Sequence, residues 1–151
     1  MTRFVDITDR KKLNSLLQKL NVHTKPLWGK MNAQHMVEHM VQQIEYSNGK
    51  KATTCDIPAE EAAREKEKWI YTDAEIPKNL ILGPLPENFR YANLETAITQ
   101  LMKELDDFEE YFKESGITSI HAGYGPMNYK EWLIWHGKHF THHFRQFGLL
   151  P

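Results

Sequence analysis

The chain lacks the features of secreted and membrane proteins. It has one cysteine, Cys55, so no disulfide can form within it, and such sparing use of cysteine is typical of a reducing compartment. No apolar run approaches the roughly 20 residues of a membrane-spanning helix. Residues 1–12 contain no apolar stretch of the signal-peptide type. We therefore expect a cytoplasmic protein with no membrane partner.

An excess of charge of either sign is also lacking. Nineteen Lys and Arg residues face 20 Asp and Glu residues, which gives a net charge of −1 and no electrostatic reason to expect a nucleic-acid partner. The hydrophobic content of 40% and charged content of 26% are ordinary for a soluble globular protein. With 151 residues, the chain has the length of one domain, so we expect a single domain over residues 1–151.

Convincing strand patterns are lacking as well. Apolar residues instead recur at the three- and four-residue spacing of helices. Polar caps such as Asn32 and Asn128, and stop signals such as Gly116, mark helix ends. The expected helices span residues 9–20, 33–48, 59–70, 94–115 and 129–147. Four are long and amphipathic, so the sequence predicts an all-α fold, a four-helix bundle with an extra short helix.

The extra helix and the connection after it differ from the rest. Residues 59–70 are strongly helical but mostly polar, so we expect this helix to pack through Trp69 and Ile70 alone. A stretch of about twenty residues follows, with prolines at Pro77, Pro84 and Pro86. A connection of that length is unusual inside a compact domain and often covers or borders a functional site.

Six of the eight histidines lie in two of the expected helices, about 100 residues apart in sequence. Imidazoles three or four residues apart on a helix share one face. One helix can therefore offer two nitrogens to a metal, and a facing helix can add a third. Three histidines that leave positions open are typical of a catalytic metal rather than a closed structural site. These six are His35, His39, His136, His139, His142 and His143.

Helical geometry, at 100° per residue, ranks these histidines. In the second helix, His39 lies closer to the apolar face than His35 does. In the last helix, His136 and His143 lie near the centre of the apolar face and His139 at its edge, whereas His142 lies almost opposite and should be exposed. His136 and His143 are about 10 Å apart along the axis, too far to share one ion. Geometry therefore favours His39, His139 and either His143 or His136; the alternative is a histidine-rich core without metal.

Segments at both ends of the chain resemble a known superfamily. KHFTHHFRQ is similar to the NHxxHHRGQ signature of the DinB/YfiT-like superfamily of metal-dependent enzymes. LWGKMNAQHMVEHM, together with HAGYGPMNYKEWLIWHGKHFTHHFRQFGLL, resembles a branch of it that is still a domain of unknown function. Residues 50–93 contribute little. The resemblance implies a four-helix bundle whose divalent metal is held by an early histidine and an HxxxH pair, which match His39, His139 and His143.

The chain departs from this pattern in two places. The branch tends to show HPxFG before the last helix, where this chain has His121-Ala-Gly-Tyr124-Gly, so the loop proline is missing and the role of His121 is open. The Arg-Gly-Gln that follows the paired histidines is Phe144-Arg145-Gln146 here. The arginine is thus displaced by one position, which turns it about 100° around the helix.

The resemblance also implies a chemistry. Characterised superfamily members include transferases and isomerases that use low-molecular-weight thiols, so we expect a thiol-dependent S-transferase or isomerase that acts on a small electrophile. Zinc suits three imidazoles best, with nickel, iron and manganese as alternatives. Each ligand's second nitrogen needs an orienting partner. Glu38, Gln42, Gln43 and Gln146 lie nearby in sequence, although solvation is the more ordinary role for each.

Two alternatives remain open at this point. A metal-hydroxide hydrolase needs a general base, for which His136 and His121 are the candidates. A non-catalytic bundle could instead store metal or form a homodimer through aromatic surface. The tryptophans that could supply this surface are Trp28, Trp69, Trp132 and Trp135.

Overall fold

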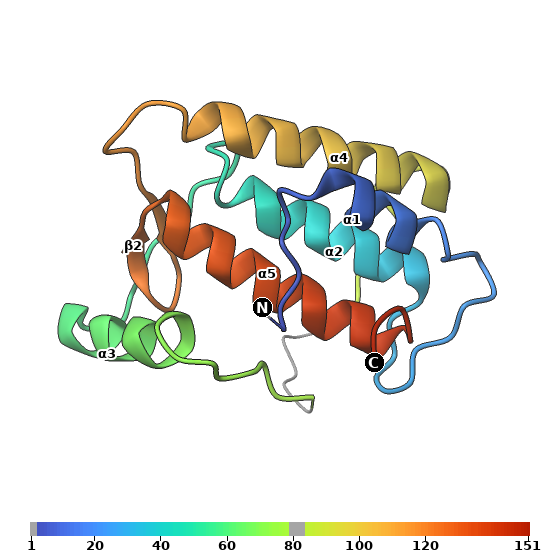
Figure 1. Ribbon diagram of the computed structural model, residues 1–151, viewed down its shortest axis with the longest axis horizontal. Helices are drawn as coiled ribbons and strands as arrows, with labels where there is room; N and C mark the ends of the chain where they lie inside the picture. Colours follow the sequence, from blue (N-terminus) through green and yellow to red (C-terminus); the bar gives the residue numbers. More distant parts are fainter. Residues whose placement is uncertain (1–2, 79–83) are drawn as a thin grey trace.

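The computed structural model describes residues 3–78 and 84–151. Within these residues the chain is mostly helical, with five α-helices and one two-stranded sheet (Figure 1). None of the described helices is long and apolar enough to cross a membrane. In chain order, the elements are α1 (Arg10–Leu17), α2 (Ala33–Glu45), α3 (Ala59–Ile70), α4 (Leu94–Tyr111), β1 (Ser119–His121), β2 (Gly125–Met127) and α5 (Tyr129–Gln146).

The five helices expected from the sequence are confirmed, although most end earlier than their apolar pattern does. Asn32 caps α2 and Asn128 caps α5. Each side chain accepts a hydrogen bond from the backbone N–H three residues later in the chain. Beyond the C-terminal ends of α1 and α2, the chain continues in tighter turns. In these turns a backbone N–H donates to the carbonyl three residues earlier, as Leu20 does to Leu17. The apolar pattern persists through such turns, which explains the overestimated lengths.

The expectation that the chain has no strands is wrong for the short hairpin before α5. β1 and β2 pair antiparallel, with Ser119 opposite Met127 and His121 opposite Gly125. The backbone of Gly125 has a φ of 74°, a conformation that glycine adopts without strain. Strands of three residues are too short to show an alternating pattern, so periodicity could not detect them.

The core lies between α2, α4 and α5, with α1 beside α4 (Figure 1). Its largest fully buried side chains include Trp132, Phe108, Phe140 and Phe144. Burial of each such aromatic side chain contributes about 1.5–3 kcal/mol.

The short helix α3 lies at the edge of this core, beside β2 and α5 (Figure 1), and contributes Ile70 to it. The expectation that it packs through Trp69 and Ile70 alone is wrong. Ala62 and Ile70 are buried, whereas Trp69 is only half-buried and donates to Glu65 on the same helix.

The N-terminal segment crosses α5 at Gly137. The backbone N–H of Val5 donates to Oγ1 of Thr141 at 2.8 Å. A Cβ atom at Gly137 would lie 2.6 Å from the carbonyl oxygen of Val5, closer than real contacts allow. Only glycine therefore permits this close approach of backbone to helix.

Gly137→Ala should therefore destabilise the protein. We expect a loss of about 1–3 kcal/mol in the free energy of unfolding, because the clash with Val5 outweighs the better helix propensity of alanine. Urea denaturation measures this difference. Gly123→Ala is the control, since its Cβ would meet no atom closer than 3.6 Å. Equal stability of the Gly137→Ala variant and the unaltered protein would contradict the close packing.

Candidate metal centre

Three histidines from two helices turn their Nε2 atoms toward one another. The Nε2 atoms of His39 on α2 and His143 on α5 each lie 3.0 Å from Nε2 of His139. The candidate ligand atoms of the three residues all lie within 4.8 Å of one another. Nitrogens bound to a tetrahedral zinc ion at about 2.0–2.1 Å are roughly 3.3 Å apart. The three side chains therefore fit one divalent metal ion.

The helices explain this convergence. His139 and His143 are one turn apart on α5, so their rings share one face. α2 packs against α5, and this contact adds His39 from the facing helix. The choice between His143 and His136, which helical geometry left open, is thus decided by position, because it is His143 that lies with the other two.

Burial keeps these imidazoles neutral. It lowers the pKa of His39 to about 4 and that of His143 to about 3. It also lowers the pKa of His139 well below its ordinary value. Neutral imidazoles at pH 7 keep a lone pair for a metal, which is the protonation state that ligation requires. His139 and His143 are buried, whereas His39 is partly exposed and gives the centre its open side.

Gln146 orients one of the candidate ligands. Its Oε1 atom lies 2.7 Å from Nδ1 of His143, and its Nε2 donates to the Trp28 carbonyl at 3.0 Å. Because an amide oxygen can only accept, Nδ1 of His143 carries the proton and Nε2 keeps its lone pair for a metal. The expectation that Gln146 is solvated is therefore wrong, since its side chain is buried.

The other candidate orienting residues lie elsewhere. The buried carboxylate of Glu38 accepts the backbone N–H groups of Arg90 and Tyr91, at 2.8 and 3.1 Å, and so fastens the segment before α4 to α2. Gln42 is exposed and Gln43 is half-buried. Nδ1 of His139 has no hydrogen-bond partner among the described residues, although it is buried.

Gln146→Leu should weaken metal binding about 10- to 100-fold, because loss of an outer hydrogen-bond partner costs that much. Gln146→Glu should lose less affinity than Gln146→Leu, since a carboxylate still accepts the His143 proton although it can no longer donate to the Trp28 carbonyl. Gln42→Leu, on the exposed side of α2, is the control. Competition with a coloured chelator measures the affinity. An unchanged affinity in Gln146→Leu would show that the hydrogen bond to His143 is incidental.

His136 lies in the core rather than at the metal centre. Its side chain is fully buried, and its Nε2 lies 2.7 Å from Oγ of Ser47. The Ser47 hydroxyl donates to the Ile44 carbonyl at 2.9 Å, so the imidazole must be the donor to Ser47. Burial lowers the pKa of His136 to about 3. As a candidate general base, His136 has no access to solvent.

His121, the other candidate base, lies in β1 within an aromatic cluster. Its ring stacks on Tyr124, with 4.0 Å between ring centroids, and meets the ring of Trp135 edge-on at 4.9 Å. Trp135 in turn stacks on His139 at 5.7 Å. One indole ring therefore separates His121 from a candidate metal ligand.

Two histidines have roles that the sequence did not indicate. His142 was expected to be exposed, but it is half-buried, and its ring forms a hydrogen bond with the backbone of Ile76. The connection after α3 lies against this side of α5, a long-range contact that helical periodicity cannot reveal. His35 completes a capping box, because its Nδ1 accepts the backbone N–H of Asn32. The spacing Asn32-x-x-His35, with histidine in place of glutamate, was the available signal.

The long connection after α3 was expected to cover or border the site, and the structure describes part of that connection. Pro77 lies in the described portion, beside residues that contact α5. Residues 79–83, in the middle of the proline-containing stretch, lie outside the described residues.

Comparison with protein-family models, with curated proteins and with solved structures finds no match for this chain. The geometry of the histidines is therefore the observation on which a function can be based.

Proposed function

We propose that the chain is a divalent-metal-dependent enzyme of the DinB/YfiT-like type. In this proposal, α1, α2, α4 and α5 are the four helices of the bundle, and α3 is the extra short helix. The observation that carries the proposal is the convergence of the Nε2 atoms of His39, His139 and His143. The ligand set and the bundle are those that the resemblance implies.

The surroundings of the three histidines support catalysis rather than storage. Three neutral ligands leave coordination positions open, as in catalytic sites. Gln146 fixes His143, and Trp135 covers His139 by stacking on it, which excludes water from one side. A bound divalent metal acts as a Lewis acid and makes a thiol or water that binds it more acidic. Zinc is the metal we expect, with nickel, iron and manganese as alternatives.

The reaction we propose is thiol-dependent, an S-transfer or isomerisation that starts with attack on a small electrophile. The thiol gives its proton to solvent and its sulfur forms a bond to the electrophilic carbon. At the same time the bond from that carbon to a leaving group breaks, or a π bond of that carbon opens, and the electron pair goes with it. The thiol itself follows from the resemblance. Hydrolysis is less well supported, because it needs a base within reach of a water molecule. His136 is fully buried and already bonded to Ser47.

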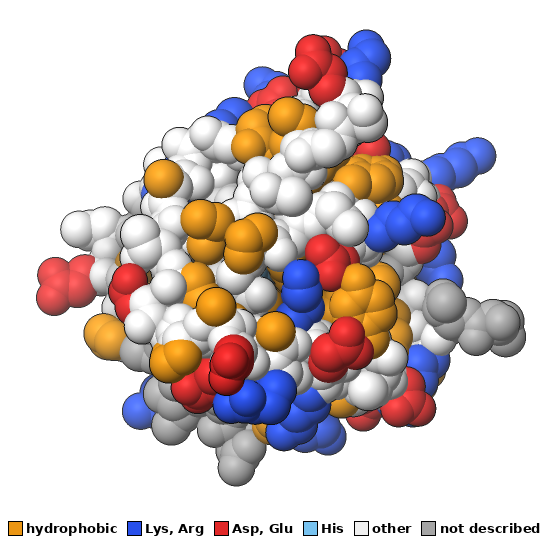
Figure 2. Space-filling model, turned by 90° about the vertical axis from the view of Figure 1, so that its left-hand side faces the viewer, with side chains coloured by type: hydrophobic (Ala, Val, Ile, Leu, Met, Phe, Trp, Pro, Cys, Tyr) orange, Lys and Arg blue, Asp and Glu red, His pale blue; other side chains and the backbone are white. Residues whose placement is uncertain are grey.

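A bundle that dimerises through tryptophans also has less support. All four tryptophans are buried or half-buried. On the face shown in Figure 2, hydrophobic side chains form small separate groups among charged ones rather than one continuous patch. Such scattered apolar side chains are ordinary for a monomer surface.

Thiol consumption by zinc-loaded protein tests this function. A panel of low-molecular-weight thiols and small electrophiles is incubated with the protein, and the loss of free thiol is followed over time. We expect a rate that depends on protein concentration and that falls at least 100-fold in His139→Ala. Zinc-loaded protein that consumes no thiol with any electrophile would overturn the thiol-dependent reaction.

A further inference from the structure

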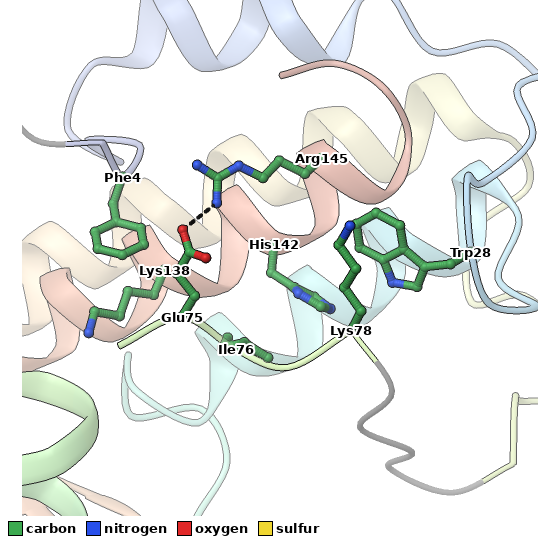
Figure 3. A pocket seen from close by; sticks show the side chains of 8 residues that line it. All are labelled: Phe4, Trp28, Glu75, Ile76, Lys78, Lys138, His142 and Arg145. Atoms are coloured by element: carbon green, nitrogen blue, oxygen red, sulfur yellow. Dashed lines mark hydrogen bonds and ion pairs between the residues drawn. The ribbon is translucent and has the colours of Figure 1, made fainter. Parts of the chain in front are cut away.

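A hollow lies between α5, the connection after α3 and the loop that carries Trp28 (Figure 3). Its cavity volume is about 80 Å³, and the cavity is open to solvent on one side. This is room for a small chemical group rather than for a whole drug-sized ligand, whose sites measure about 300–1,000 Å³. The side chains that matter most in its lining are Trp28, Ile76, Lys78, Lys138, His142 and Arg145.

One wall of the hollow is fastened to α5 by a stripe of three residues, Lys138, His142 and Arg145. Their spacing places them on one face of the helix. The Lys138 ammonium donates to the Thr72 carbonyl at 2.8 Å, and Arg145 pairs with the Glu75 carboxylate at 2.9 Å. The His142 ring bonds to the backbone of the next residue along the connection. The wall is therefore held in place before any ligand binds.

Positive charge exceeds negative charge around the hollow. The Glu75 carboxylate pairs with Arg145 at 2.9 Å (Figure 3). It also pairs with Arg3 at 3.5 Å. Within residues 3–78 and 84–151, the exposed Lys78 ammonium pairs with no carboxylate and instead lies 4.7 Å from the centre of the Trp28 ring. An unpaired ammonium beside an aromatic ring suits a ligand that carries an anionic group next to an apolar part.

His142 links the hollow to the metal centre. Its ring lines the hollow and meets Trp28 edge-on, with 5.7 Å between ring centroids. It also meets the ligand His143 edge-on at 5.0 Å. A molecule in the hollow therefore lies one imidazole ring away from a candidate metal ligand.

We propose that this hollow binds the carboxylate or phosphate group of the small molecule on which the metal centre acts, an inference that rests on the function proposed above. The anionic group lies against Lys78 and Arg145, and the apolar part of the molecule packs against Trp28 and Ile76. The substrate is therefore an anionic electrophile.

Binding of benzoate and of inorganic phosphate to zinc-loaded protein tests the site, with the indole N–H signal of Trp28 as the NMR probe. The two anions distinguish a carboxylate site from a phosphate site. We expect at least one of them to bind, with affinity at least tenfold lower in Lys78→Glu. Lys103→Glu, an exposed charge reversal on α4, should leave the affinity unchanged. His139→Phe, which removes a metal ligand, should also bind the anion.

The variants separate this inference from the metal proposal. Binding that is lost in His139→Phe but kept in Lys78→Glu would place the anion on the metal and overturn the site. Binding of neither anion would overturn it as well, whatever the metal content. In the thiol reaction, Lys78→Glu should raise the KM of a carboxylate-bearing electrophile at least fivefold and leave that of a neutral one unchanged. Equal KM values for the anionic electrophile in both proteins would exclude the hollow from the reaction.

Discussion

Replacing His139 with alanine should abolish stable metal binding. Its Nε2 is the central atom of the three, 3.0 Å from both His39 and His143. Without it, two nitrogens on different helices remain, too few to hold a metal tightly. We expect the metal affinity to fall by more than about 100-fold. This exceeds the loss expected for a residue such as Gln146, which only hydrogen-bonds to a candidate ligand. Equilibrium dialysis with zinc, followed by metal analysis of the protein, measures the loss.

Two further variants make this result specific to His139. His139→Phe keeps an aromatic ring on the face of Trp135 and should preserve the helical circular dichroism while it loses the metal. His142→Ala, next to a ligand on the same helix, should keep the metal, since its ring bonds to the connection instead. A folded His139→Phe variant that binds zinc as tightly as the unaltered protein would contradict the three-histidine centre.

Acidification should destabilise the metal-free protein strongly. Burial lowers the pKa of His136 to about 3 and that of His121 to about 4. In the unfolded chain both rings titrate near pH 6.5. As the pH falls below about 6.5, the unfolded state takes up protons that the folded state refuses, so stability decreases. The decrease continues until the pH reaches the folded pKa values, near 4 and 3.

The expected decrease in the free energy of unfolding is large. Between pH 7 and pH 5, these two rings together should cost on the order of 4 kcal/mol of unfolding free energy. This is a substantial part of the 5–15 kcal/mol typical of a domain. Urea denaturation in the presence of a chelator, repeated at several pH values, measures it. In His136→Gln, the slope of the unfolding free energy against pH should fall by the amount that corresponds to about one proton. A free energy of unfolding that stays constant from pH 7 to pH 5 would show that these rings are not buried as described.

The helices and the three candidate ligands could be predicted from the sequence because both depend on local spacing. The four-residue separation of His139 and His143 fixes them on one face, whatever else the chain does. His39 could be ranked above His35 by the same geometry, and the resemblance supplied the choice of His143.

The features that the sequence missed depend on contacts between distant residues. Gln146 could be named as a candidate partner because it lies three residues after His143, but the Trp28 carbonyl that holds its amide group lies 118 positions earlier in the chain. His142 is covered because the connection after α3 folds back over α5. His136 was a plausible ligand until Ser47 was placed beside it by the packing of α2 on α5. Trp28, Ile76 and Ser47 lie far in sequence from the residues that they hold, so no fixed spacing could show these contacts.

The metal content of the purified protein tests the central proposal most directly. Tag-free protein is prepared without chelators and analysed by inductively coupled plasma mass spectrometry, both as isolated and after reconstitution with zinc, nickel or manganese. A three-histidine centre predicts about one equivalent of bound metal per chain in at least one of these preparations. No bound metal in any of them would contradict it, and the histidines would then serve only the packing of the helices.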